Sequence, residues 1–181
     1  MALKASISKV RLSVSDLDRG VYADFSLSVA QHPSETEARM MLRVAAFALH
    51  ADEQLAFGRG ISTDDEPDLW LRDLTGDIDL WVDLGAPDPD RLRKACGRAR
   101  QVVLYGYGDR ALPVWWDKHG DALARFANLS VFAVSDEERQ ALAGLFGSNI
   151  ELQATISEGE LWLTDGEATV SVAPTSLKRA V

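Results

Sequence analysis

The sequence predicts an α/β (α+β) fold built on a central mixed sheet, with a β-hairpin at the N-terminus and a β-meander at the C-terminus. Alternating apolar and polar residues open the chain and return near its end, as in strands with one face in water. In the middle of the chain, apolar residues at helical spacing follow helix-capping signals. Two apolar runs without alternation, VVLYGYG and NLSVFAV, indicate interior strands covered on both faces.

The N-terminal hairpin is predicted from residues 10–14 and 21–29, which alternate around the polar connection DLDRG. Ser34 and Glu37 then have the spacing of a capping box, which predicts a helix to about Ala51 and places Glu35 in its first turn. Three short strands are expected next, over residues 55–58, 68–72 and 78–84.

A second helix is predicted to start at Asp88 as the N-cap and Pro89 as the first helical residue. After the first interior strand, residues 113–125 have a helical pattern, and the second interior strand follows. Ser135 and Glu138 form a second capping box for a short helix that ends near Gly147. Turns at residues 158–159 and 165–166 divide the C-terminal meander, and the residues after Ala173 are expected to be a flexible tail.

Composition indicates one globular domain that spans residues 1–181. Hydrophobic residues make up 46% of the chain and charged residues 26%, which are ordinary values for a protein with a buried core. No apolar run approaches the ~18 residues of a membrane-spanning helix, and the alternating N-terminus does not resemble a secretory signal. A single cysteine, Cys96, excludes an internal disulfide, so we expect a reducing, cytoplasmic location.

The charge balance limits the classes of partner. The formal net charge is −9, whereas nucleic-acid binding draws much of its affinity from Lys and Arg on phosphates. We therefore expect no membrane contact and no extended nucleic-acid groove. The partner itself, a protein or a nucleic acid, is unknown at this stage.

Acidic residues at two neighbouring strands are the strongest candidates for chemistry. Asp68 begins one predicted strand, and Asp79 and Asp83 lie on the next, where they share a face with Trp81 because the side-chain period of a strand is two. Carboxylates gathered at strand ends can hold Mg²⁺ with water completing the octahedron. A solvated polar face is the alternative interpretation, and the sequence does not decide between the two.

The order of the elements resembles the αβββαβ core of PD-(D/E)XK nucleases. Pro67-Asp68 and Asp83-Leu84-Gly85 look like the two half-motifs of that superfamily, except that Gly85 stands where a lysine is usual. The resemblance implies that Lys94, on the following helix, replaces the lysine, and that Glu35 is the acid often contributed by the first helix. Asp68, Asp79 and Asp83 would be the metal ligands.

A more specific resemblance extends over residues 1–165. The phrases that carry it are MALKA, SDLDR, HPSET, RMMLR, DDEP, IDLW, KAC, FANLSV and LQATI. Together they are similar to the YaeQ family of small bacterial proteins. The resemblance implies a compact α/β fold related to PD-(D/E)XK nucleases, and it assigns no activity.

Two hypotheses about function follow. The first is a binding module on a nuclease-like scaffold that has lost turnover, which the missing lysine at Gly85 and the acidic surface favour. The second is a Mg²⁺-dependent phosphodiesterase, in which Asp68 and Asp83 hold the metal that activates water and Lys94 stabilises the charge on the phosphate. In that case Asp79 or Glu35 would support the metal site.

Overall fold

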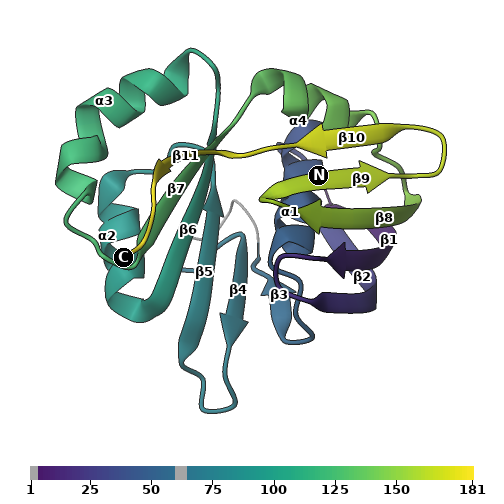
Figure 1. The fold of residues 1–181 in the computed structure, drawn as a ribbon, viewed down its shortest axis with the longest axis horizontal. Helices are drawn as coiled ribbons and strands as arrows, with labels where there is room; N and C mark the ends of the chain where they lie inside the picture. The colour runs from purple at the N-terminus through teal and green to yellow at the C-terminus, as the bar shows by residue number, and fades with distance from the viewer. Residues whose placement is uncertain (1–3, 60–64) are drawn as a thin grey trace. The chain divides into compact units, whose positions relative to one another are not determined.

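The computed structural model describes residues 4–59 and 65–181, which form two compact units (Figure 1). The first unit combines the chain up to Ala51 with Glu137–Ala173, and the second combines Asp52–Asp136 with Pro174–Val181. Each unit contains its own mixed sheet. The prediction of a mixed α+β protein is confirmed, whereas the central sheet is replaced by two sheets. That residues 1–181 act as a single domain stays a prediction.

The sheet of the first unit joins the two ends of the chain. Its strand order is β10-β9-β8-β1-β2, and β1 pairs antiparallel with β2 and parallel with β8. The predicted hairpin and meander therefore meet in one sheet instead of extending a central one. The bounds are β1 (Ser6–Asp16), β2 (Val21–Gln31), β8 (Asn149–Ser157), β9 (Glu160–Thr164) and β10 (Thr169–Val172).

Helix α1 (Glu37–Leu49) is nearly all buried, in keeping with its run of apolar residues. Its N-cap is Thr36, whose hydroxyl accepts a hydrogen bond from the Arg39 N–H at 3.1 Å. The predicted capping box is therefore wrong: the Ser34 hydroxyl lies 2.7 Å from Nδ1 of His32. Because the helix begins after Thr36, Glu35 precedes the helix instead of lying in its first turn.

The sheet of the second unit has the order β11-β7-β6-β5-β4-β3. Strands β5, β6 and β7 are parallel neighbours, and the remaining pairs are antiparallel. The residues expected to be a tail instead form β11 at the edge of this sheet, because they pair with β7. The bounds are β3 (Leu55–Phe57), β4 (Leu69–Arg72), β5 (Ile78–Leu84), β6 (Ala99–Tyr107), β7 (Leu129–Val134) and β11 (Thr175–Lys178).

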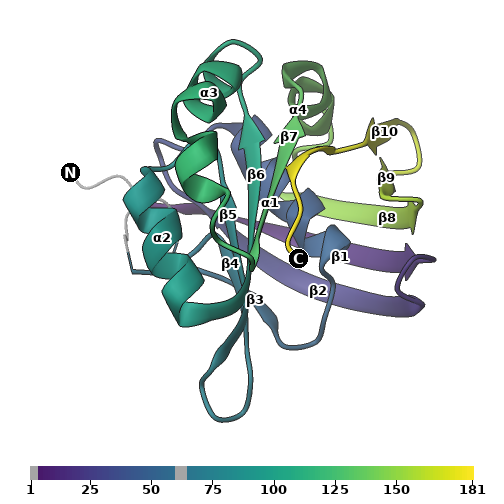
Figure 2. The same ribbon diagram turned by 60° about the vertical axis from the view of Figure 1, so that its left-hand side comes forward.

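Helices α2 (Pro89–Arg98) and α3 (Ala111–Leu123) contact each other and β6 (Figure 2). The predicted start of α2 is confirmed: the Asp88 carboxylate accepts from the Asp90 N–H at 2.8 Å, and Pro89 is the first helical residue. Helix α4 (Asp136–Ala143) starts directly after Ser135, as expected. The chain order α1-β3-β4-β5-α2-β6 confirms the predicted αβββαβ order of elements. In the described part of the chain, no helix is long and apolar enough to cross a membrane.

Candidate functional site

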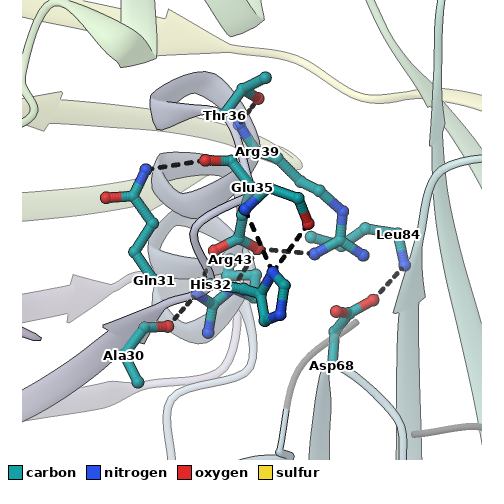
Figure 3. A network of polar contacts seen from close by, with 10 residues as sticks. Ala30, Gln31, His32, Glu35, Thr36, Arg39, Arg43, Asp68 and Leu84 are labelled. Carbon is teal, nitrogen blue, oxygen red and sulfur yellow. Dashed lines mark hydrogen bonds and ion pairs between the residues drawn. The ribbon is translucent and has the colours of Figure 1, made fainter. Parts of the chain in front are cut away.

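The two motif acids, Asp68 and Asp83, lie at the same end of the β4–β5 pair. The antiparallel register pairs Leu69 with Val82. Asp68 directly precedes Leu69 and Asp83 directly follows Val82, so these two acids are the next residues across the pair. Both acids are buried. The Asp68 carboxylate accepts a hydrogen bond from the Leu84 N–H at 2.9 Å (Figure 3). Asp68 therefore anchors the end of β5 directly beside Asp83.

Asp83 is 1% exposed, and its carboxylate is held by Arg91 of α2. Nε of Arg91 donates to Oδ2 at 2.9 Å, and Nη2 donates to Oδ1 at 3.2 Å. Nη2 also donates to the Glu66 carbonyl at 2.7 Å. This two-bond arrangement is the strong form of an Arg–carboxylate pair, and it compensates the burial of the negative charge.

The part of β5 that carries Trp81 and Asp83 is covered by α2. Trp81 is 2% exposed and packs in a core cluster with Leu92 and Ala95 of that helix. The guanidinium groups of Arg91 and Arg98 lie 5.7 and 5.1 Å from its ring centre, which is the distance range of a cation–π contact. The alternative of a solvated polar face is therefore wrong for Trp81 and Asp83, because α2 covers them.

Asp79 lies apart from this arrangement. It is partly exposed at the other end of β5, where its Oδ1 lies 3.1 Å from Nη1 of Arg100. An exposed ion pair of this kind contributes little to stability. Asp79 as a metal ligand stays a prediction, and its observed partner is an arginine.

Lys94, the predicted substitute for the motif lysine, is a surface residue. Its side chain is 67% exposed, and its ammonium lies 3.2 Å from Asp90, one turn earlier on α2. Arg91 is the basic residue that contacts Asp83, and the sequence argument passed over it. Arg91, Ala95 and Arg98 share a helical stripe at i, i+4 and i+7, and the apolar Ala95 on that stripe was the available signal that it faces the core.

In the first unit, Glu35 is also neutralised by arginines (Figure 3). Nη2 and Nε of Arg43 donate to its two carboxylate oxygens at 2.5 and 3.1 Å, and Nη1 of Arg39 donates to Oε2 at 2.8 Å. Arg43 also donates to the Ala30 carbonyl at 2.6 Å, and the Gln31 amide donates to the Glu35 carbonyl at 2.9 Å. These bonds tie the end of β2 to α1. A catalytic role for Glu35 stays a prediction.

The residues present do not fit a Mg²⁺ ion. Mg²⁺ takes carboxylate and water oxygens in an octahedron, but each oxygen of Asp83 already accepts from Arg91. Over residues 4–59 and 65–181, no three His, Cys, Asp or Glu side chains gather closely enough to hold a metal. The geometry therefore defines a structural ion pair at the motif position, and no step of a metal-dependent reaction follows from it.

Fold and site together define an α+β protein with two mixed sheets and the element order αβββαβ, in which the buried Asp83 is paired with an internal arginine. The chain belongs to the YaeQ family, because the family model described as "YaeQ protein" matches residues 1–174.

Sequence relatives and solved structures agree with this assignment. The chain is 46% identical over 176 residues to the "Uncharacterized protein YaeQ" of Salmonella typhi, and the match covers 97% of each chain. It is also 46% identical over 172 residues to the "Uncharacterized protein YaeQ" of Escherichia coli K12, and this match covers 95% of each chain. The crystal structure of YaeQ from Xanthomonas axonopodis pv. citri matches with a TM-score of 0.94 and 47% identity, over 98% of this chain and 99% of that one. The YaeQ structure from Pseudomonas syringae matches with a TM-score of 0.92 and 38% identity, over 97% of both.

Proposed function

We propose that this chain is a non-catalytic protein-binding module of the cytoplasm, built on a PD-(D/E)XK nuclease-like scaffold. The order of elements and the neighbouring places of Asp68 and Asp83 on β4 and β5 support the scaffold. The observation that carries the loss of catalysis is the buried pair of Asp83 and Arg91. A guanidinium occupies both oxygens of the carboxylate that a nuclease would offer to its metal.

The backbone at Gly85 supports the same conclusion. Its φ of +98° lies in the left-handed region that favours glycine. Its N–H donates to the Tyr105 carbonyl at 2.9 Å, which fixes this conformation beside β6. A lysine at this motif position would be strained, so the local backbone disfavours the superfamily lysine, which is also absent from the sequence.

The alternative, a Mg²⁺-dependent phosphodiesterase that uses Asp68, Asp83 and Lys94, would require two rearrangements. Arg91 would have to leave Asp83 and break the two hydrogen bonds that now compensate the burial of its carboxylate. Lys94 would have to leave Asp90 and turn toward the strand ends. We therefore favour the binding module.

The charges of the second unit favour a protein over a nucleic acid as the partner. Apart from Arg98, the basic residues of α2 and the start of β6 are paired with acids: for example, Arg93 lies 2.6 Å from Asp90, and Arg100 lies 3.1 Å from Asp79. The chain as a whole carries a net charge of −9. Phosphate binding by these side chains would cost the existing ion pairs.

The β4–β5 connection offers an apolar contact for a protein partner. Leu74 is 96% exposed at this connection, which Figure 1 draws at the far end of the two strands. The turn is ordered by Asp73, whose Oδ1 accepts from the N–H groups of Thr75 and Asp77 at 2.8 and 3.0 Å. A leucine held in water on a preordered turn loses little entropy on binding, so an apolar recess on a partner protein suits it.

The absence of catalysis is tested with Mn²⁺ and bis(p-nitrophenyl) phosphate. Calorimetry should detect no Mn²⁺ binding, and the wild-type chain should release no p-nitrophenol above the rate with metal alone. Metal-dependent hydrolysis that Asp83→Asn abolishes, and that the exposed control Asp90→Asn retains, would overturn the proposal.

The protein partner is tested by affinity capture with wild-type chain, Leu74→Ser and the control Val114→Ser, which alters another exposed apolar residue. We expect a stoichiometric protein that the wild type and Val114→Ser retain and Leu74→Ser loses. Nucleic acid as the stoichiometric bound material, or equal capture by all three chains, would contradict the proposal.

A further inference from the structure

The outer edge of β2 is unusual among the sheet edges of the described residues. The other three edge strands are short: β10 and β11 have 4 residues each and β3 has 3. Proteins use such short strands to protect sheet edges from pairing with other chains. Strand β2 has 11 residues, so it extends over about 37 Å at ~3.4 Å per residue.

Strand β2 also lacks the side chains that usually protect an edge. Its sequence, VYADFSLSVAQ, contains no Lys, Arg, Pro or Gly, and Asp24 is its one charged residue. All 11 residues pair with β1 in a continuous register, so no bulge bends the edge away. In the described part of the chain, no strand pairs with the other side of β2.

The apolar row on the inner face of β2 is incompletely covered. Val21, Ala23, Phe25 and Leu27 are all partly exposed, whereas their neighbours on β1, such as Leu12 and Val14, are buried. A further strand beside β2 would complete the cover of this row. The edge therefore combines apolar surface with a backbone that no second strand of the described residues pairs, and near its end the Ala30 carbonyl accepts from Arg43.

We propose that β2 pairs antiparallel with β2 of a second copy of the chain, with the two-fold axis at Ser26. Ser26 is the central residue of Val21–Gln31, so this register uses the whole strand in both copies. Each side chain then faces one on the same side of the sheet. The exposed Tyr22 lies opposite the small Ala30, and Phe25 lies opposite Leu27.

The charges fit this register. The Lys9 ammonium donates to the Ser28 hydroxyl at 2.6 Å, so it lies toward the edge of the sheet. In the dimer, Asp24 of the second copy lies opposite Ser28 and so comes next to that ammonium, twice by symmetry. A register centred on Asp24 would instead oppose two carboxylates, which is unfavourable. Because the opposite edge, β10, is short, pairing through β2 closes at two copies.

The mass of the chain in solution tests this proposal. Sedimentation equilibrium should give twice the chain mass of 19.8 kDa. Ser26→Glu/Ser28→Glu puts acids opposite each other and opposite Asp24 of the second copy, and should raise the dissociation constant at least about tenfold. Within one copy these acids lie beside Arg11 and Lys9, so the fold should persist by circular dichroism. The control Gln153→Glu/Thr155→Glu adds the same charge to exposed positions of the interior strand β8, which pair with Ser13 and Ser15 instead of Lys9, and should leave the dimer unchanged.

Cross-linking tests the position of the two-fold axis. In a Cys96→Ala background, Ser26→Cys should be linked into a dimer by a short bis-maleimide, whereas Asn149→Cys should not. A monomer at all concentrations would overturn the proposal. So would a dimer that the Ser26→Glu/Ser28→Glu variant leaves unchanged, or a copurified peptide that occupies β2.

Discussion

Removal of the Arg91 side chain is the most informative perturbation of the candidate site. Arg91→Ala would leave the carboxylate of Asp83, 1% exposed, without its cation. Breaking a buried pair from one side costs about 3 to 5 kcal/mol. The Arg91 side chain is 23% exposed, so water can partly replace it, and we expect a loss of about 2 to 4 kcal/mol in the free energy of unfolding.

Thermal or denaturant unfolding measures this loss. For a chain of this length, 1 kcal/mol corresponds to roughly 2 to 4 °C in Tm, so Arg91→Ala should lower Tm by about 4 to 16 °C. The matched control is Lys94→Ala on the same helix, whose exposed pair with Asp90 should contribute less than about 1 kcal/mol. Adding the apolar substitution Asp83→Leu to Arg91→Ala should recover part of the loss, because no unpaired charge remains. Equal unfolding temperatures of Arg91→Ala and Lys94→Ala would show that the buried pair of Arg91 stabilises the chain no more than the exposed pair of Lys94.

Three further predictions concern other positions. Gly85→Ala should destabilise the chain by about 1 to 2 kcal/mol in urea unfolding, because the φ of Gly85 is +98°. The control Gly97→Ala in α2, with open space around the residue, should stabilise the chain by about 0.4 to 1 kcal/mol. Equal effects of the two substitutions would contradict the prediction for Gly85. Burial, with Arg19 nearby, lowers the pKa of His50 from 6.5 to about 4, so the unfolded chain binds this proton at a higher pH than the folded chain does. The free energy of unfolding should therefore decrease as the pH falls from about 6.5 to 4, by at most about 1.4 kcal/mol per pH unit. Urea unfolding measured against pH should show a smaller slope in His50→Gln. Burial raises the pKa of the Cys96 thiol to about 11, so iodoacetamide should label it much more slowly at pH 8 than in the urea-unfolded chain.

Local patterns in the sequence predicted the elements well, and their failures have a common physical cause. Asp88 and Pro89 start α2 as expected, because a helix start depends on a few adjacent residues. The parallel pairing of β1 with β8 was not predicted, because it joins Lys9 to Asn149 and no local pattern encodes a partner that distant in the chain.

The relative places of the candidate site residues were predicted in part. Asp68 and Asp83 do come next to each other, since strand register follows from alternation. The burial of Asp83 and its pairing with Arg91 instead of Lys94 depend on how α2 covers β5, which is a tertiary packing event. Strand alternation placed Trp81 on one face with Asp79 and Asp83, but it did not indicate that α2 covers Trp81 and Asp83.

The central claim is that Arg91, and no metal ion, neutralises Asp83. A crystal structure from crystals soaked in Mn²⁺, with data collected for anomalous scattering, tests it most directly. We expect no anomalous peak beside Asp68 or Asp83, and we expect the Arg91 guanidinium still bonded to both oxygens of Asp83. A peak about 2 Å from carboxylate oxygens of Asp68 and Asp83, with Arg91 displaced, would contradict it.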